Sequence, residues 1–214
     1  GPLRRLAWRA LVTGPVQQTV RGAAAVLGLS PADREIVAAM GLAGSFALVP
    51  NGVPLPGPAD SGEDTAICRR LGVPARRPGE LTAMFLANHT PNKGLPILLE
   101  AFSGLNCPYT LIVGGETRPE IDYSLANRKR RSDQRIIVTG RVSDREVEAL
   151  FRRSALFVFP TLADTFPLVV LEAMSHGLPV LASRVGGIPH QLDQGSGQLV
   201  EPGDVGGLRE TISA

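Results

Sequence analysis

The chain has 214 residues, 43% of them hydrophobic, and a formal net charge of +2. This composition argues against intrinsic disorder, and the near balance of charge gives no bulk basic field that would recruit nucleic acid or an anionic membrane. The one dense basic run, at 128–131, has no aromatic residues interleaved and is typical of the solvated end of a helix. We therefore expect no nucleic-acid partner.

Cysteine usage and hydropathy favour a cytoplasmic protein. Cys68 and Cys107 lie far apart, without the spacing of a disulfide framework or a zinc site. No apolar run approaches the roughly 20 residues that span a bilayer, and no signal peptide is visible. The expectation is a protein of a reducing compartment with no transmembrane segment.

The N-terminal part of the sequence predicts a helix followed by a small strand–helix–strand pattern. Residues 3–12 are basic and apolar at helical spacing, which favours a helix that packs on a further domain or lies on a membrane surface. The runs 23–30, 31–41 and 46–53 then predict a strand, a helix and a strand. We interpret the polar, Pro- and Gly-rich stretch at 54–63 as a boundary or linker.

From residue 81 onward, short apolar runs alternate with longer segments of helical period. The apolar runs lack polar alternation, which is typical of strands buried on both faces of a parallel sheet; they lie at 81–87, 110–114, 135–140, 156–160 and 178–183. The segments between them have the length of crossover helices; they lie at 94–104, 119–131, 143–153 and 167–176. The predicted fold class is α/β, with a doubly wound, Rossmann-like parallel sheet.

Two carboxylates, Asp164 and Glu172, enclose an apolar segment that follows a predicted strand. Pro167 suits the first turn of a helix, because its missing N–H costs nothing there. The amides of Leu168 and Val169 are then free donors at a helix start, where α/β folds bind phosphate. Carboxylates beside such a place suit neutral, hydroxyl-rich groups such as sugars. Each acid alone is equally typical of an ordinary helix, and Asp164 would then only favour the helix dipole.

Other predicted strand ends carry residues that suit the same kind of ligand. Lys93 follows the run 81–87, and it is one of only 2 lysines among 22 basic residues, which favours a specific role such as binding a diphosphate. Gly114 and Gly115 end the next strand and let a ligand approach the backbone closely. An exposed lysine and a plain turn are the alternatives. Because the carboxyl ends of parallel strands meet at one edge, we expect these residues to converge there.

In their order and spacing these motifs resemble the family-4 retaining glycosyltransferases of the GT-B fold, in particular their C-terminal, nucleotide-sugar-binding domain. The resembling segments are VPNGV (49–53), PNKG (91–94), LIVGG (111–115), GRVSDREVEALFRRSALFVFPT (140–161), DTFPLVVLEAMSHGLPVLASRVGGIP (164–189) and GQLVEPGD (197–204). The resemblance implies half of a two-domain enzyme. Residues 1–53 would be the tail of the N-terminal acceptor domain, 54–80 the linker and start of the C-terminal domain, and 81–214 the donor-binding domain.

The resemblance also implies roles for individual residues. Asp164 and Glu172 would be the two acids of an E-x7-E motif, contacting the donor sugar and the ribose, and Lys93 would neutralise the diphosphate. These three are the catalytic candidates. The remaining expected donor contacts are Asn88, Gly114, Gly115, Gly140, Arg141, Val142, Phe166, Pro167, Leu168 and Val169. No cofactor or metal is implied, since lysine and a helix dipole supply the positive charge.

The implied activity is transfer of a sugar, with retention, from a UDP- or GDP-type nucleotide sugar to an acceptor hydroxyl in polysaccharide or glycolipid synthesis. The carbohydrate or lipid acceptor would bind through an N-terminal domain that is largely missing, so the chain alone is expected to be nearly inactive. The parent enzyme would work in the cytoplasm, at the inner face of the membrane.

Some positions depart from the family pattern and keep alternatives open. Asp164 stands where Glu is usual, Pro167 where Gly is common, Asn88 where Arg is expected and His190 where Glu is frequent. The alternatives are a nucleotide-sugar epimerase or a phosphorylase of the same fold, and a non-catalytic interaction module with a decayed nucleotide site. Asn88 is the best sequence sign of such decay.

Overall fold

The computed structural model describes residues 14–39, 41, 46–124 and 131–214, which fall in two compact units, Gly1–Asn51 and Gly52–Ala214. The first unit contains α2 (Gly14–Gly22), β1 (Val26–Gly28), α3 (Pro31–Ala39) and β2 (Phe46–Leu48). β1 and β2 pair in parallel through the crossover helix α3, as the strand–helix–strand pattern predicted. The helix expected at 3–12 lies outside the described residues.

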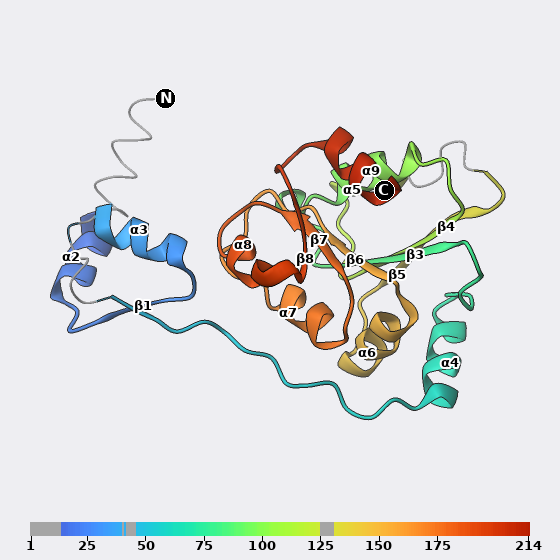
Figure 1. Ribbon diagram of the computed structural model, residues 1–214, viewed down its shortest axis with the longest axis horizontal. Coiled ribbons are helices and arrows are strands. Elements are labelled where there is room, and N and C mark those ends of the chain that lie inside the picture. Colours follow the sequence, from blue (N-terminus) through green and yellow to red (C-terminus); the bar gives the residue numbers. More distant parts are fainter. Residues whose placement is uncertain (1–13, 40, 42–45, 125–130) are drawn as a thin grey trace. The chain divides into compact units, whose positions relative to one another are not determined.

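The second unit is built on a six-stranded parallel sheet (Figure 1). Its strands are β3 (Leu81–Leu86), β4 (Tyr109–Gly114), β5 (Gln134–Gly140), β6 (Leu156–Phe159), β7 (Val180–Ser183) and β8 (Gly197–Val200). They lie in the order β5-β4-β3-β6-β7-β8, and every neighbouring pair is parallel. The predicted doubly wound, Rossmann-like fold is confirmed, because this order runs outward in both directions from the central pair β3 and β6.

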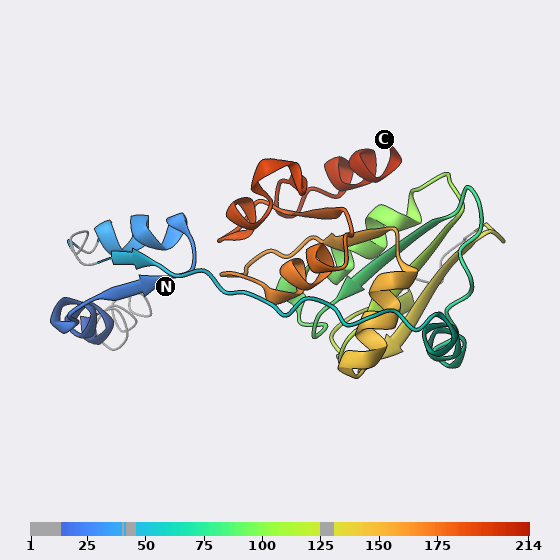
Figure 2. The same ribbon diagram turned by 60° about the horizontal axis from the view of Figure 1, so that its bottom comes forward.

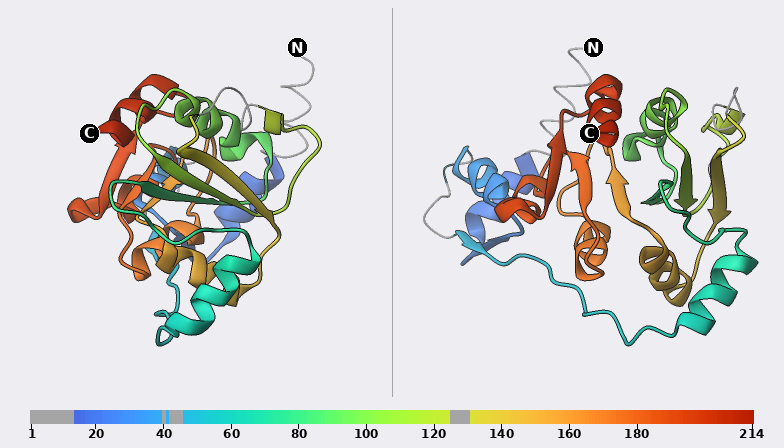
Figure 3. Two further views of the ribbon diagram at one scale, coloured as in Figure 1. Left: turned by 90° about the vertical axis from the view of Figure 1, so that its right-hand side faces the viewer. Right: turned by 45° about the vertical axis from the view of Figure 1, so that its right-hand side comes forward.

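Helices cover both faces of this sheet (Figure 3). α5 (Leu95–Ser103) and α9 (Val205–Ser213) lie on one face, and α6 (Asp144–Arg153) and α7 (Leu168–Ser175) lie on the other. The connections β3–α5–β4 and β6–α7–β7 run in opposite directions from the centre, so right-handed crossovers place their helices on opposite faces. The chain therefore leaves β3 and β6 toward different sides, which opens a crevice between them.

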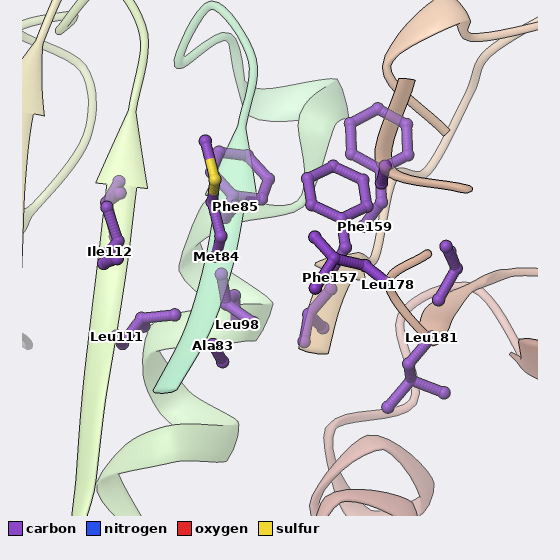
Figure 4. Packing of buried hydrophobic residues seen from close by; sticks show 14 of the residues in the cluster. Ala83, Met84, Phe85, Leu98, Leu111, Ile112, Phe157, Phe159, Leu178 and Leu181 are labelled. Carbon is purple, nitrogen blue, oxygen red and sulfur yellow. The ribbon is translucent and has the colours of Figure 1, made fainter. Parts of the chain in front are cut away.

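The core lies where the central strands meet the helices (Figure 4). Met84, Phe85 and Ile112 are fully buried, as expected for strands covered on both faces. The ring of Phe159 on β6 lies 6.2 Å from that of Phe85 on β3 and 6.0 Å from that of Phe157, measured between centroids. This aromatic packing directly underlies the strand ends that carry the candidate residues.

A helix that the sequence did not predict, α4 (Ser61–Arg70), lies in the stretch expected to be a linker. The Asp60 side chain caps it by accepting hydrogen bonds from two first-turn amides at 3.0 Å. α4 packs beside α6 (Figure 2), where Arg145 pairs with Asp64 at 2.8 Å and with Glu63 at 2.7 Å. Only Ile67 and Cys68 of α4 are apolar side chains buried in the core, so its apolar face is too short for the sequence to show a helical period.

The helix predicted at 119–131 is wrong in its described part, since residues 119–122 form turns and irregular structure and only Tyr123 and Ser124 take a 3-10 conformation. Side chains compete there for the backbone groups that a helix would use. The Asp122 carboxylate accepts a hydrogen bond from the Ser124 amide at 2.8 Å, and the Tyr123 hydroxyl accepts one from the Arg118 amide at 3.2 Å. Residues 125–130 lie outside the described chain.

The remaining elements are short: η3 (Pro91–Lys93), α8 (Ile188–Gln191) and η5 (Asp193–Gly195). No helix among the described residues combines the length and the apolar character needed to cross a membrane.

Gly94, between η3 and α5, offers a test of how tightly the loops are packed. Its φ is +76°, and a Cβ there would overlap the Pro160 carbonyl, whereas Gly72 has φ +75° with open space around it. We expect Gly72→Ala to lower the free energy of unfolding by about 1 kcal/mol through backbone strain alone. Gly94→Ala should cost more than about 3 kcal/mol, because backbone must also move. Urea unfolding of both variants measures the difference; equal losses would contradict the close approach.

Candidate functional site

A cleft of about 900 Å³ lies in the second unit, lined by the loops that leave β3, β4, β5 and β6. All the candidate residues from the sequence line it except Gly114 and Gly140. Gly140 lies outside the lining, although its carbonyl accepts a hydrogen bond from the Gly115 amide at 2.9 Å and so supports it. The expectation that the strand ends converge on one rim is therefore confirmed.

The Lys93 ammonium and the Asp164 carboxylate form an ion pair of 2.6 Å across the cleft floor. Their side chains are 26% and 15% exposed, and the ammonium also lies 5.8 Å from the centroid of the Phe159 ring. Partial burial strengthens such a pair relative to one at the surface. An anion that binds Lys93 must therefore compete with Asp164.

The two loops that carry this ion pair are tied together by backbone. The Asn92 carbonyl accepts hydrogen bonds from the Leu162 amide at 2.7 Å and from the Thr161 hydroxyl at 3.0 Å. The Asn92 side chain in turn donates to the Ala163 carbonyl at 3.3 Å. The ion pair thus rests on a fixed connection between the ends of β3 and β6.

The helix α7 begins at Leu168, one residue later than the sequence predicted. Pro167 is its N-cap, with φ −67° and ψ 119°, so it lies just outside the helix rather than in its first turn. No cap side chain accepts from the first-turn amides. The Val170 amide donates to the Pro167 carbonyl at 3.2 Å, so the amides of Leu168 and Val169 are the available donors in this described first turn. The Pro167 carbonyl accepts a hydrogen bond of 3.0 Å from the buried Gln191 side chain of α8, which fixes this helix start.

Glu172 lies one turn along α7, half-buried in the cleft wall. Burial raises its pKa above the ordinary value, the nearby Asp144 carboxylate raises it further, and His176 acts in the opposite direction. A raised pKa means that burial and the Asp144 charge disfavour the ionised carboxylate. A ligand hydroxyl that donates a hydrogen bond to Glu172 would favour the ionised form again.

Asp144 was missed as a site residue. Ser143 is the N-cap of α6, and it forms a capping box with Glu146, whose carboxylate accepts from the Ser143 amide at 2.7 Å. Asp144 follows in the first turn and lines the cleft. Its place two residues after Val142, an expected donor contact, was the available signal.

The cleft contains more acid than the sequence reading suggested. Five carboxylates and two cations line it: Glu116, Asp144, Glu148, Asp164 and Glu172 against Lys93 and Arg141. Three of these acids have basic partners, Glu116 with Arg118, Glu148 with Arg152 and Asp164 with Lys93. The remaining two, Asp144 and Glu172, make no ion pair within the described part of the chain.

The apolar lining was also largely missed. Val147 and Phe151 of α6, His176 at the C-cap of α7 and the segment Val53–Pro56 contribute to the cleft. The sequence assigned no site role to them, and for Val147 and Phe151 that role depends on which face of α6 turns inward. Within the described ranges, no group of three or more His, Cys, Asp or Glu side chains is placed to hold a metal ion.

A Rossmann-like sheet with a polar cleft at its central switch point defines an α/β ligand-binding domain. Residues 80–214 match the family of glycosyl transferases group 1, and the chain belongs to this family.

Curated relatives agree with this assignment. The D-inositol 3-phosphate glycosyltransferase of Mycolicibacterium smegmatis is 33% identical over 135 residues, which cover 60% of this chain and 31% of that protein. The O-antigen chain mannosyltransferase B of Escherichia coli is 31% identical over 136 residues, covering 61% of this chain and 35% of that protein. The chain thus spans about a third of the length of these relatives.

Solved structures share the fold. HepE of Anabaena in complex with UDP-glucose has a TM-score of 0.70 at 22% identity, covering 92% of this chain and 57% of that one. A glycosyltransferase from Rickettsia africae has a TM-score of 0.76 at 19% identity, covering 88% of this chain and 52% of its own. The architecture is therefore that of the GT-B glycosyltransferases.

We expect the pKa of Glu172 to fall in the variant Asp144→Asn, because one carboxylate charge is removed while burial is unchanged. Carboxyl ¹³C NMR titration of Glu172 measures it, with Asp193→Asn, an exposed acid outside the cleft, as control. Since the folded state binds this proton more tightly than the unfolded chain, ionisation of Glu172 lowers stability as the pH rises through its folded pKa. Glu172→Gln should abolish that dependence; an unshifted pKa in Asp144→Asn would contradict the coupling.

Proposed function

We propose that this chain is the donor-binding part of a retaining glycosyltransferase that transfers a sugar from a UDP- or GDP-type nucleotide sugar to an acceptor hydroxyl. The observation that carries the proposal is the meeting of Lys93, the free amides of α7 and Glu172 in one cleft, in a chain of the group 1 family. A cation and helix amides suit a diphosphate, and carboxylates suit sugar hydroxyls.

Each cleft group has a role in this proposal. Lys93 and the amides of Leu168 and Val169 stabilise the departing diphosphate, Asp164 orients the transferred sugar, and Glu172 accepts hydrogen bonds from the ribose. The loop with Gly140, Arg141 and Val142 forms the wall beside the base. Lysine and amides supply the positive charge without a metal.

The parent enzyme would have a second domain for its acceptor. Residues 1–53 would be the tail of that domain, 54–80 the connection and 81–214 the donor domain, which agrees with a compact unit that begins at Gly52 and a family match that begins at residue 80. The names of relatives, among them an O-antigen chain mannosyltransferase, favour a polysaccharide or glycolipid acceptor. Work at the inner face of the membrane follows from such acceptors, and the chain alone would transfer little sugar.

A non-catalytic interaction module with a decayed nucleotide site is the second candidate. It is favoured by the uncharged Asn88 and by the ion pair that occupies Lys93. Nucleotide binding that depends on Lys93 would favour the glycosyltransferase. If the chain bound no nucleotide, the interaction module would be favoured.

Two substitutions at the ion pair should change nucleotide affinity in opposite directions. Lys93→Met should weaken UDP or GDP binding about 10-fold, because a charge-assisted hydrogen bond is lost. Asp164→Asn should strengthen binding of the free nucleotide, because it releases Lys93 and removes a repelling charge. Calorimetric titration of the chain with UDP and GDP measures both.

Arg184→Met is the matched control, since Arg184 pairs with Glu201 away from the cleft. Unchanged affinity in Lys93→Met, or no binding of either nucleotide to the unmodified chain, would overturn the proposal.

A further inference from the structure

His89, the third residue after β3, is completely buried. Its ring lies 6.0 Å from that of Phe85 and 5.7 Å from that of Tyr123, between centroids. It does not line the cleft, yet its neighbours Asn88 and Lys93 on the same loop do. No sequence motif marked His89 as a candidate residue.

Both ring nitrogens of His89 are hydrogen-bonded. Nε2 lies 3.2 Å from the Gly114 carbonyl, and Nδ1 lies 2.6 Å from the Tyr123 hydroxyl. A carbonyl only accepts, so Nε2 carries the proton and Nδ1 accepts the hydrogen of Tyr123. The Tyr123 oxygen in turn accepts from the Arg118 amide at 3.2 Å. Each polar group of this network therefore has a hydrogen-bond partner and a defined role as donor or acceptor.

These bonds join two loops that both supply cleft residues. One loop, 87–93, carries Lys93, and the other, 115–123, begins with Gly115 and Glu116. The backbone adds a third link, because the His89 amide donates to the Glu116 carbonyl at 2.9 Å. A Cβ at Gly115 would overlap the Ala87 carbonyl, so the loops are already in backbone contact beside this network. These contacts hold the loop that carries Lys93 in a fixed position relative to the end of β4.

Packing alone does not account for a polar pair at this place. Two apolar rings of the same shape would fill the space without the cost of desolvating an imidazole and a phenol. Burial lowers the pKa of His89, which keeps the ring neutral and Nδ1 an acceptor. What hydrogen bonds add over apolar contact is direction, and direction fixes the relative position of the two loops.

We propose that His89 is a positioning residue for the diphosphate part of the donor site, acting through Tyr123 and the Gly114 carbonyl. This inference rests on the proposed function. His89 touches no substrate; it holds the loop of Lys93 and the loop of Gly115 at the separation that a diphosphate requires.

The test compares UDP with UMP, or GDP with GMP if the chain prefers guanine, on the full chain. His89→Phe keeps the ring contacts and removes both side-chain hydrogen bonds, and Tyr123→Phe removes a single oxygen. Each should weaken binding of the nucleoside diphosphate about 10-fold and weaken binding of the monophosphate clearly less. His89→Gln, whose amide can still donate to Gly114, should recover part of the loss.

His190→Phe, a histidine of α8 outside the cleft, is the control for the substitution itself. Thermal unfolding of every variant separates positioning from general destabilisation, and Tyr123→Phe keeps the test decisive if His89→Phe does not fold. Equal loss of diphosphate and monophosphate affinity, or unchanged diphosphate affinity, overturns the role of His89 while nucleotide binding by the unmodified chain stands. Failure of the unmodified chain to bind UDP or GDP overturns the proposed function, and this inference with it.

Discussion

The cleft depends on the close backbone contact between the loop after β3 and the end of β6. The Asn92 carbonyl accepts hydrogen bonds from the Leu162 amide and the Thr161 hydroxyl, and Gly94 leaves no room for a side chain against Pro160. The two strands are neighbours at the centre of the sheet, where the chain turns toward opposite faces. Without this contact the crevice would widen, and Lys93 would not reach Asp164.

Much of the fold could be predicted because parallel strands that are buried on both faces have continuous apolar sequences. The runs that became β3 to β7 needed no partner information, since hydrophobic burial on both faces leaves no polar alternation. α4 could not be found this way. It buries only Ile67 and Cys68 in the core, and its other contacts are the Asp60 cap and ion pairs with Arg145, about eighty residues away in the chain, so its own residues look like a polar linker. The helix predicted at 119–131 was wrong in its described part for a related reason, since side chains there form hydrogen bonds with nearby backbone groups.

The candidate site was predictable where it depends on strand ends and unpredictable where it depends on helix rotation. Lys93 and Asp164 follow strands, and topology alone brings such positions to one edge. Asp144 and Glu148 of α6 and His176 of α7 line the cleft only because of how each helix is rotated about its axis. Packing against β3 and α4 sets the rotation of α6, and packing against α8, β6 and β7 sets that of α7, which involves residues outside each helix.

The two departures at Asn88 and Asp164 have one combined electrostatic consequence. With an uncharged residue at 88, the described cleft lining contains the cations Lys93 and Arg141, and Asp164 already holds Lys93 at 2.6 Å. In the proposed function, a complete donor can exchange this pair without leaving a charge alone. Its diphosphate takes the ammonium, while its sugar hydroxyls donate to the released carboxylate. A nucleotide without the sugar leaves Asp164 unpaired and half-buried, which is costly. The ion pair therefore makes the sugar itself part of the free energy of donor binding, and so favours the intact donor over the spent nucleotide.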